Sequence, residues 1–246
     1  GGGIYIITRF NGIIFTIKIF DSLECDTNGC NRRFELVCDV ADEIISRLKP
    51  RIKELKVGAY SQEDGEMGPV VAPDAQDRIL SYIDLGVQEG AELVVDGRGI
   101  QVAGYENGCF VGATVFDKVE PQMTIYKEEI FGPVLSLVRA GSYEEAVSLI
   151  NEHEYGNGTA IFTRDGDIAR DFSHRIQIGM VGVNVPIPVP LAFHSFGGWK
   201  RSLFGDHHIH GPEGVRFYTR MKTITSRWSS GIRAGAVYNF KRGGEH

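Results

Sequence analysis

Cysteine is scarce in this 246-residue sequence. The four cysteines are Cys25, Cys30, Cys38 and Cys109, and no two of them form a Cys-x-x-Cys pair. That set is too sparse for a disulfide framework in a chain of this length. Thiols that stay reduced fit a reducing compartment, so we expect a cytoplasmic protein, or one of the mitochondrial matrix if the source is eukaryotic.

Positive charge and long apolar runs are also lacking. Lysine and arginine total 26 against 32 acidic residues, a net charge of -6. Nucleic-acid binding needs a concentrated positive face, so we expect no nucleic-acid partner. The most apolar stretch, residues 4–20, is interrupted by Arg9, Asn11 and Lys18. It is too short and too polar to cross a bilayer, and it lacks the order of a signal peptide, so we expect no membrane partner.

The N-terminal 33 residues differ from the rest of the chain. Residues 4–20 are rich in Ile and Phe and are divided by Asn11-Gly12. An Asn-Gly pair between two β-prone runs predicts a β-hairpin, because both positions tolerate positive φ. Residues 21–33 are polar and predict a loop.

Two amphipathic helices are predicted next. From Phe34 onward, apolar residues recur at three- and four-residue steps as far as Leu55, which predicts one helix that Pro50 kinks or divides. Residues 62–69 predict a loop. A second helix follows, with Pro73 in its first turn.

The middle of the chain alternates strands with helices. We predict strands over residues 92–96, 110–116, 133–139, 159–163 and 180–184. One helix begins after Ser142, with Glu145 three residues on as in a capping box, and another covers residues 167–176. This alternation predicts an α/β fold whose parallel sheet is flanked by helices. Residues 215–227 alternate as an exposed or partner-paired strand.

Four motifs carry a family resemblance. Residues 127–134 (KEEIFGPV) resemble the EEIFGPV signature of the aldehyde dehydrogenase superfamily, and residues 155–158 (YGNG) its YGL motif. Residues 179–184 (GMVGVN) and 195–202 (SFGGWKRS) resemble its GxVxxN and PFGGxKxS motifs. The resemblance runs from about Phe34 to Arg233. It divides the chain into a divergent segment (1–33), a catalytic and C-terminal region (34–228) and a tail (229–246).

Three further segments resemble one branch of that superfamily, the CoA-acylating methylmalonate-semialdehyde dehydrogenases. They are GYENG at 104–108, VNVPIPVP at 183–190 and FYTRMKTITSRW at 217–228. The resemblance implies NAD as cofactor, CoA as co-substrate and a small semialdehyde as substrate, which is oxidised and decarboxylated to propionyl-CoA or acetyl-CoA. It also implies a homo-oligomer that assembles through residues 215–227.

The resemblance assigns residues to the cofactor and the substrate. Glu129 matches the carboxylate that holds the nicotinamide ribose, and Phe131 matches the aromatic side chain beside it. Phe196 and Pro190 match the substrate pocket, and Asn184 matches a residue that supports the catalytic loop. From spacing alone, the favoured interpretation of Glu129 is a solvated loop charge and that of Phe131 a core residue, and the surrounding motif reverses this choice. Phe196 fits a core residue and a pocket wall equally well.

The nucleophile is the residue that the sequence marks least well. The family reaction needs a thiolate, and Cys30 is the nearest candidate, ahead of Cys25. The family's flanking residues are absent, and Gly29 stands where an arginine would hold the substrate carboxylate. His194, His207, His208 and His210 fit no standard zinc spacing, so we expect no metal.

Three functional hypotheses follow. The chain is the C-terminal part of a semialdehyde dehydrogenase; since the family's NAD-binding domain precedes this region, we expect the chain alone to be inactive. Alternatively it is a non-catalytic oligomerisation or interaction module, or an acylating dehydrogenase for another acid semialdehyde. NADH production and the oligomeric state of the purified chain distinguish these hypotheses.

Overall fold

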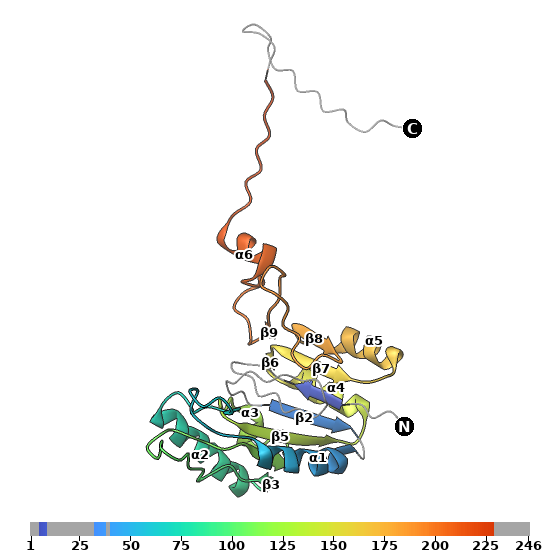
Figure 1. The fold of residues 1–246 in the computed structure, drawn as a ribbon. Helices are drawn as coiled ribbons and strands as arrows, with labels where there is room; N and C mark the ends of the chain where they lie inside the picture. Colours follow the sequence, from blue (N-terminus) through green and yellow to red (C-terminus); the bar gives the residue numbers. More distant parts are fainter. Residues whose placement is uncertain (1–4, 9–31, 38–39, 229–246) are drawn as a thin grey trace.

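A sheet covered by helices forms the body of the molecule in the computed structural model, which describes residues 5–8, 32–37 and 40–228 (Figure 1). The strands are β1 (Tyr5–Thr8), β2 (Arg32–Val37), β3 (Glu92–Val95), β4 (Thr114–Asp117), β5 (Val134–Ala140), β6 (Tyr155–Gly156), β7 (Gly158–Phe162), β8 (Met180–Val183) and β9 (Trp199–Lys200). The helices are α1 (Val40–Glu54), α2 (Pro73–Gln88), α3 (Thr124–Lys127), α4 (Tyr143–Glu152), α5 (Gly166–Arg175) and α6 (Gly211–Tyr218).

The main sheet has the order β3-β4-β5-β2-β1-β7-β8, and β6 pairs with β9 in a separate two-stranded sheet. Neighbours β4, β5 and β2 are parallel, as are β7 and β8. The predicted α/β class with a parallel sheet is therefore confirmed. Two strands are not parallel to their neighbours. Strand β1 runs antiparallel to both β2 and β7, and β3 runs antiparallel to β4.

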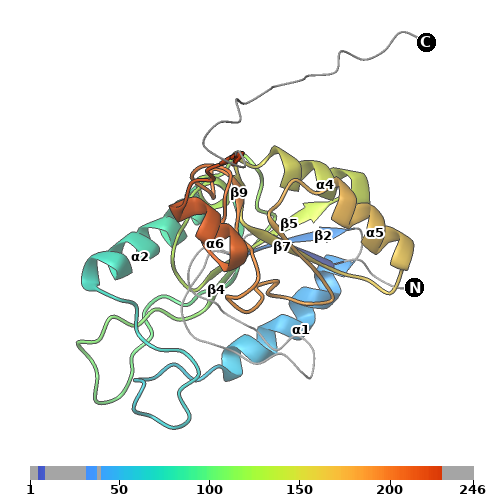
Figure 2. The same ribbon diagram turned by 90° about the horizontal axis from the view of Figure 1, so that it is seen from above.

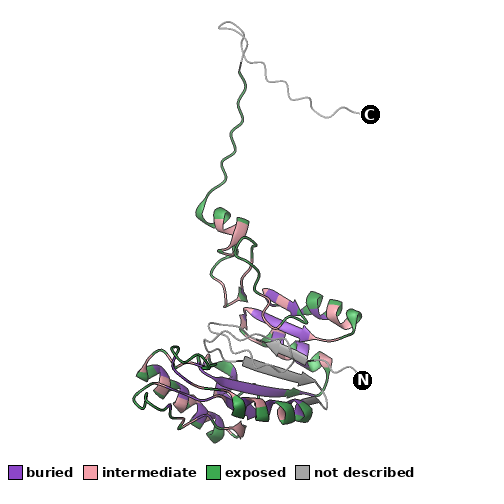
Figure 3. Cartoon of the chain, in the orientation of Figure 1, coloured by how far each residue is buried: buried purple, intermediate pink, exposed green. Residues whose placement is uncertain are grey.

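Alternation along β5 explains how helices cover both faces of the sheet. Leu135 and Leu137 belong to the same buried cluster as the apolar side of α1. Val134 and Val138 point the other way, into a cluster with Ile79 of α2. On that second face, α4 and α5 bury a third cluster, and they lie side by side at the end of the molecule away from α2 (Figure 2). The buried residues, purple in Figure 3, gather along strands such as β5 and β7.

The first predicted helix begins later than expected. Residues 34–37 belong to β2, and α1 begins at Val40. The error arose because a four-residue stretch with three apolar residues fits either period, and pairing with β5 and β1 decides in favour of the strand. Pro50 lies inside α1, which continues to Glu54, so Pro50 does not divide the helix.

Most other elements match their predictions. Strands β3, β5, β7 and β8 lie within one or two residues of the expected ranges, whereas β4 begins at Thr114 rather than at residue 110. Ser142 caps α4, its Oγ accepting from the backbone N–H of Glu145 at 3.1 Å. Glu145 reaches back to the N–H of Gly141 at 2.7 Å rather than to Ser142, one residue beyond the usual capping box.

The C-terminal end of the described chain differs from the sequence prediction. Residues 211–218 form α6, so the strand predicted from residue 215 is wrong there; Pro212 and Glu213 in the first turn favour a helix. Residues 219–228 form no strand, because a strand needs a partner to accept its hydrogen bonds. The predicted hairpin turn at Asn11-Gly12 lies outside the described residues, and both edges of β1 are taken by β2 and β7.

Candidate active site

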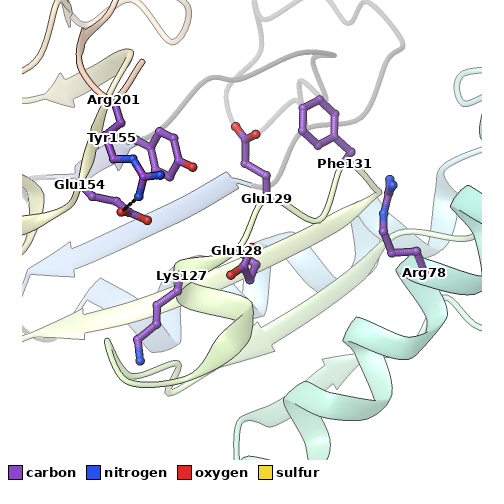
Figure 4. A pocket seen from close by; sticks show the side chains of 8 residues that line it. All are labelled: Arg78, Lys127, Glu128, Glu129, Phe131, Glu154, Tyr155 and Arg201. Carbon is purple, nitrogen blue, oxygen red and sulfur yellow. Dashed lines mark hydrogen bonds and ion pairs between the residues drawn. The ribbon is translucent and has the colours of Figure 1, made fainter. Parts of the chain in front are cut away.

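Four segments that are distant in the sequence meet around one cavity of about 510 Å³ (Figure 4). One segment is α2, the second is the turn between α3 and β5, the third joins α4 to β6, and the fourth follows β9. The lining residues are Arg78, Lys127, Glu128, Glu129, Phe131, Glu154, Tyr155 and Arg201. The cavity is therefore strongly charged, with carboxylates and cations on the same surface.

The turn between α3 and β5 sets the positions of Glu129 and Phe131. Ile130 between them is fully buried and anchors the turn, while Phe131 has a left-handed φ of 51° and remains 41% exposed. Gly132 lies against α2, since a Cβ added there would stand 2.6 Å from Cγ1 of Ile79. This anchoring lets both predicted cofactor residues extend to the same side (Figure 4).

The opposite wall comes from the β6–β9 pair and the residues beside it. Tyr155 pairs with Lys200 and Gly156 with Trp199. Next to this pair, the guanidinium of Arg201 forms an ion pair with Glu154 and lies 5.5 Å from the centre of the Tyr155 ring. The hydrogen bond and charge of Glu154 raise the pKa of Arg201, so Arg201 stays a cation at the cavity.

Lys200 is a residue that the sequence interpretation did not single out. Its Nζ donates to three backbone carbonyls at the end of α4: Ile150 at 3.5 Å, Asn151 at 2.7 Å and His153 at 3.0 Å. Burial lowers the pKa of this ammonium group. The lysine in the PFGGxKxS-like motif was the available signal, but its partners are 47 to 50 residues away in the sequence.

Asn184, Phe196 and Pro190 do not line the charged cavity. Asn184, at a φ of 58°, accepts from the Thr163 N–H and donates to the Thr163 carbonyl, both at 3.0 Å, which fixes the end of β8 to β7. The Phe196 ring stacks on His210 with 4.5 Å between centroids, and Pro190 is exposed. Their predicted roles remain predictions.

Other candidates lie elsewhere. Cys25, Cys30 and Cys38 are outside the described residues, and Cys109 is a half-buried free thiol. His207 bonds to Glu213 on α6.

Over residues 5–8, 32–37 and 40–228, no cluster of three potential metal ligands is present. Among those same residues, no helix combines the length and apolar character needed to cross a membrane.

Comparison with known proteins identifies the class. A sequence profile of the aldehyde dehydrogenase family matches residues 29–224. Since that match covers most of the chain, and the fold and the motif residues agree with it, the chain belongs to the aldehyde dehydrogenase family.

Particular relatives are more specific. Over 189 residues the chain is 66% identical to a malonate-semialdehyde dehydrogenase of Pseudomonas aeruginosa, covering 77% of this chain and 38% of that protein. Over 188 residues it is 50% identical to the acylating methylmalonate-semialdehyde/malonate-semialdehyde dehydrogenase of Bos taurus mitochondria, covering 76% and 35%. The chain thus spans less than half the length of these relatives.

Solved structures agree. A methylmalonate-semialdehyde dehydrogenase from Sinorhizobium meliloti, complexed with NAD, superimposes with a TM-score of 0.77 at 61% identity, over 80% of this chain and 40% of that one. The enzyme from Oceanimonas doudoroffii gives a TM-score of 0.76 at 54% identity, over 78% and 39%.

Proposed function

We propose that this chain forms part of the active site of an NAD- and CoA-dependent methylmalonate- or malonate-semialdehyde dehydrogenase. The supporting observation is the cavity itself. It gathers Glu129 and Phe131 of the EEIFGPV-like motif, Tyr155 of the YG motif and Arg201 of the PFGGxKxS-like motif, although the first and last are 72 positions apart. Charged groups that separate segments bring to one cavity support a role in binding the polar and charged parts of a ligand.

The lining residues fit the nicotinamide ribose of NAD. A carboxylate accepts two hydrogen bonds from vicinal hydroxyls, and Glu129 offers that group beside the exposed ring of Phe131, which supplies an apolar contact. When bound, NAD supplies the hydride acceptor of the reaction. In this proposal Glu129 orients the ribose, and Phe131 shields one side of it from water.

The substrate side of the proposal rests on residues around the cavity rather than in it. We assign Phe196 and Pro190 to the pocket for the semialdehyde and Asn184 to the support of the catalytic loop. Cys30 is the proposed nucleophile, whose thiolate would add to the aldehyde carbonyl before CoA receives the acyl group. The relatives' names support malonate and methylmalonate semialdehydes as the substrate class.

Assembly and location complete the proposal. We assign residues 215–227 to a homo-oligomer interface, because α6 has no buried residue and exposes Val215 and Tyr218. The same observation favours the second candidate function, an interaction module without catalysis. We place the protein in the cytoplasm because its cysteines are scarce, or in the mitochondrial matrix if the source is eukaryotic, as the Bos taurus relative is mitochondrial.

A segment exchange tests the function. Residues 34–228 would replace the matching segment of the Pseudomonas aeruginosa enzyme, and NADH and acyl-CoA formation would be followed with malonate semialdehyde, NAD and CoA. We expect turnover within about tenfold of the parent enzyme, since the exchanged segments are 66% identical where they align. A second exchange that begins at residue 24 places Cys30 in the chimera and tests the nucleophile separately.

Two variants of the first chimera define the outcome. Glu129→Gln removes a charged acceptor and should raise the Kd for NAD by about tenfold to a hundredfold. Glu63→Gln, an exposed loop residue outside the cavity, should leave the Kd unchanged. A chimera that assembles like the parent but makes neither NADH nor acyl-CoA would instead support the interaction module.

A further inference from the structure

The end of α4 is held by a cation that comes from another part of the chain. A helix ends with carbonyl oxygens that have no partner inside the helix and carry partial negative charge. The last turn of α4 contains no basic residue of its own. Lys200 of β9 supplies the missing charge, since its Nζ bonds to the carbonyls of Ile150, Asn151 and His153.

The backbone of Lys200 is also constrained. Its φ of 52° is in the left-handed region, which a residue with a side chain rarely adopts unless its surroundings enforce it. Hydrogen bonds on both sides provide that enforcement. Tyr155 pairs with Lys200 in the β6–β9 ladder, and the N–H of Arg201 bonds to the carbonyl of Glu154 at 3.2 Å.

The cavity is lined by residues that directly follow Lys200 and its carbonyl partners in the sequence. Glu154 and Tyr155 follow directly after the carbonyls that Lys200 binds, and Arg201 follows Lys200 itself. We propose that Lys200 is a positioning residue, which joins the end of α4 to β9 and so fixes Tyr155 and Arg201 opposite Glu129. The expected effect of Lys200 on NAD affinity rests on the proposed function. Its expected effect on the local order of the backbone near β6 and β9 does not.

Hydrogen–deuterium exchange on the full 246-residue chain tests the local part. Lys200→Met keeps the length of the side chain and removes its donors. We expect amide exchange in residues 154–156 and 199–202 to rise by about tenfold, while β5 and α2 exchange as before. Lys53→Met, on the exposed side of α1, is the matched control and should change neither region.

A purely structural lysine would give a different pattern. If Lys200→Met raises exchange equally throughout the sheet, or nowhere, the positioning role is wrong. Should Lys200→Met fail to fold, Lys200→Gln retains one donor group and must show the same local rise, smaller in size; unchanged exchange there would also contradict the proposal.

Cofactor binding to the first chimera tests the second part. We expect Lys200→Met to raise the Kd for NAD by about tenfold, with Lys53→Met unchanged. If Glu129→Gln weakens NAD binding and Lys200→Met does not, the positioning role is wrong while the proposed function stands. If neither variant changes the Kd, the cavity is not the NAD site and the proposed function fails with it.

Discussion

Helices α2 and α6 have similar beginnings and very different surroundings. Both have a proline in the first turn and an amphipathic pattern. Helix α2 buries Ile79 and Ile83 completely against the sheet. Helix α6 buries no residue and projects away from the sheet at the base of an extended segment (Figure 1). An amphipathic pattern thus predicts that a helix has an apolar side, but not that this chain supplies the surface to cover it.

The segment that carries α6 is exposed beyond the helix itself. We define the C-terminal arm as residues 203–228. It exposes large apolar side chains along its whole length: Phe204, Ile209, Val215, Phe217, Tyr218, Met221, Ile224 and Trp228. Backbone hydrogen bonds hold its base, where Gly211 donates to the Ala192 carbonyl at 3.0 Å. The sheet therefore stabilises itself, whereas the arm has an apolar surface suited to a partner.

A matched pair of phenylalanine truncations would show the largest contrast. Phe116→Ala removes a fully buried ring between the sheet and α2, and should lower the free energy of unfolding by about 3–5 kcal/mol. Phe217→Ala, in α6, should change it by less than about 0.5 kcal/mol. Urea unfolding of the purified chain measures both. Equal losses would mean that the arm packs on the body of the protein.

Glycine substitutions in the sheet region should have a smaller effect. Gly132→Ala brings a methyl group against Ile79 and should cost about 1–3 kcal/mol through overpacking. It would also displace Phe131, the neighbouring residue. Gly68→Ala is the control, because nothing lies within 4 Å of an added Cβ there. A Gly132→Ala protein as stable as the parent would show that α2 can move away from the turn.

Removal of a helix cap should cost less again. Ser142→Ala deletes the oxygen that accepts from the Glu145 N–H, with an expected loss of about 1 kcal/mol. Ser148→Ala, at an exposed position within α4, is the control. In helix α6 the N-cap residue His210 makes no such bond, and the Oγ of Ser195 accepts from the Glu213 N–H at 3.2 Å instead. Thermal unfolding followed by circular dichroism measures the loss of stability in each serine variant. An unchanged unfolding temperature for Ser142→Ala would contradict the capping role.

The smallest effect concerns pH. The Tyr143 hydroxyl lowers the pKa of Asp171 from its ordinary value of 3.8, and Arg175 lowers the pKa of Glu144 from 4.5. Because these carboxyl pKa values are lower in the folded state, their stabilising contribution is present near neutral pH and is lost as pH falls through the folded values, below about 4. In the double variant Asp171→Asn, Glu144→Gln, the free energy of unfolding should fall less steeply as the pH is lowered below about 4.

The acid response of the arm should differ. His207 lowers the pKa of Glu213 in α6. Since α6 buries nothing, protonation of Glu213 should loosen that helix without changing the unfolding midpoint of the sheet. Stability measured between pH 2.5 and 6 for Glu213→Gln provides the check. A large midpoint shift in that variant would show that the arm and the sheet unfold together.

The sequence predicted elements best where local signals and tertiary pairing agree. Ser142 capped α4 as expected, and β5, β7 and β8 followed their apolar runs. The prediction was wrong at residues 34–37, which were expected in a helix but form a strand that pairs with β5. It was also wrong at residues 215–218, where alternation predicted a strand and the structure has a helix. In both places a few residues fit two periods, and long-range contacts made the choice.

The candidate site shows the same limit. Motifs pointed to Glu129 and Phe131, which do share a cavity, and to Phe196, which instead stacks on His210. Arg78 and Glu154 were not predicted, because no motif includes them and only the fold brings them to the cavity. Lys200 stood within a motif, but its carbonyl partners could not be read from spacing.

A crystal structure of the first chimera with NAD would show directly whether the cavity holds the nicotinamide ribose. We expect density for the nicotinamide ribose within the cavity, with both Glu129 carboxylate oxygens within about 3 Å of its hydroxyls. Phe131 should contact the same sugar, with Tyr155 and Arg201 on the facing side. Density for NAD in another place, or Glu129 turned away from an ordered ribose, would contradict it.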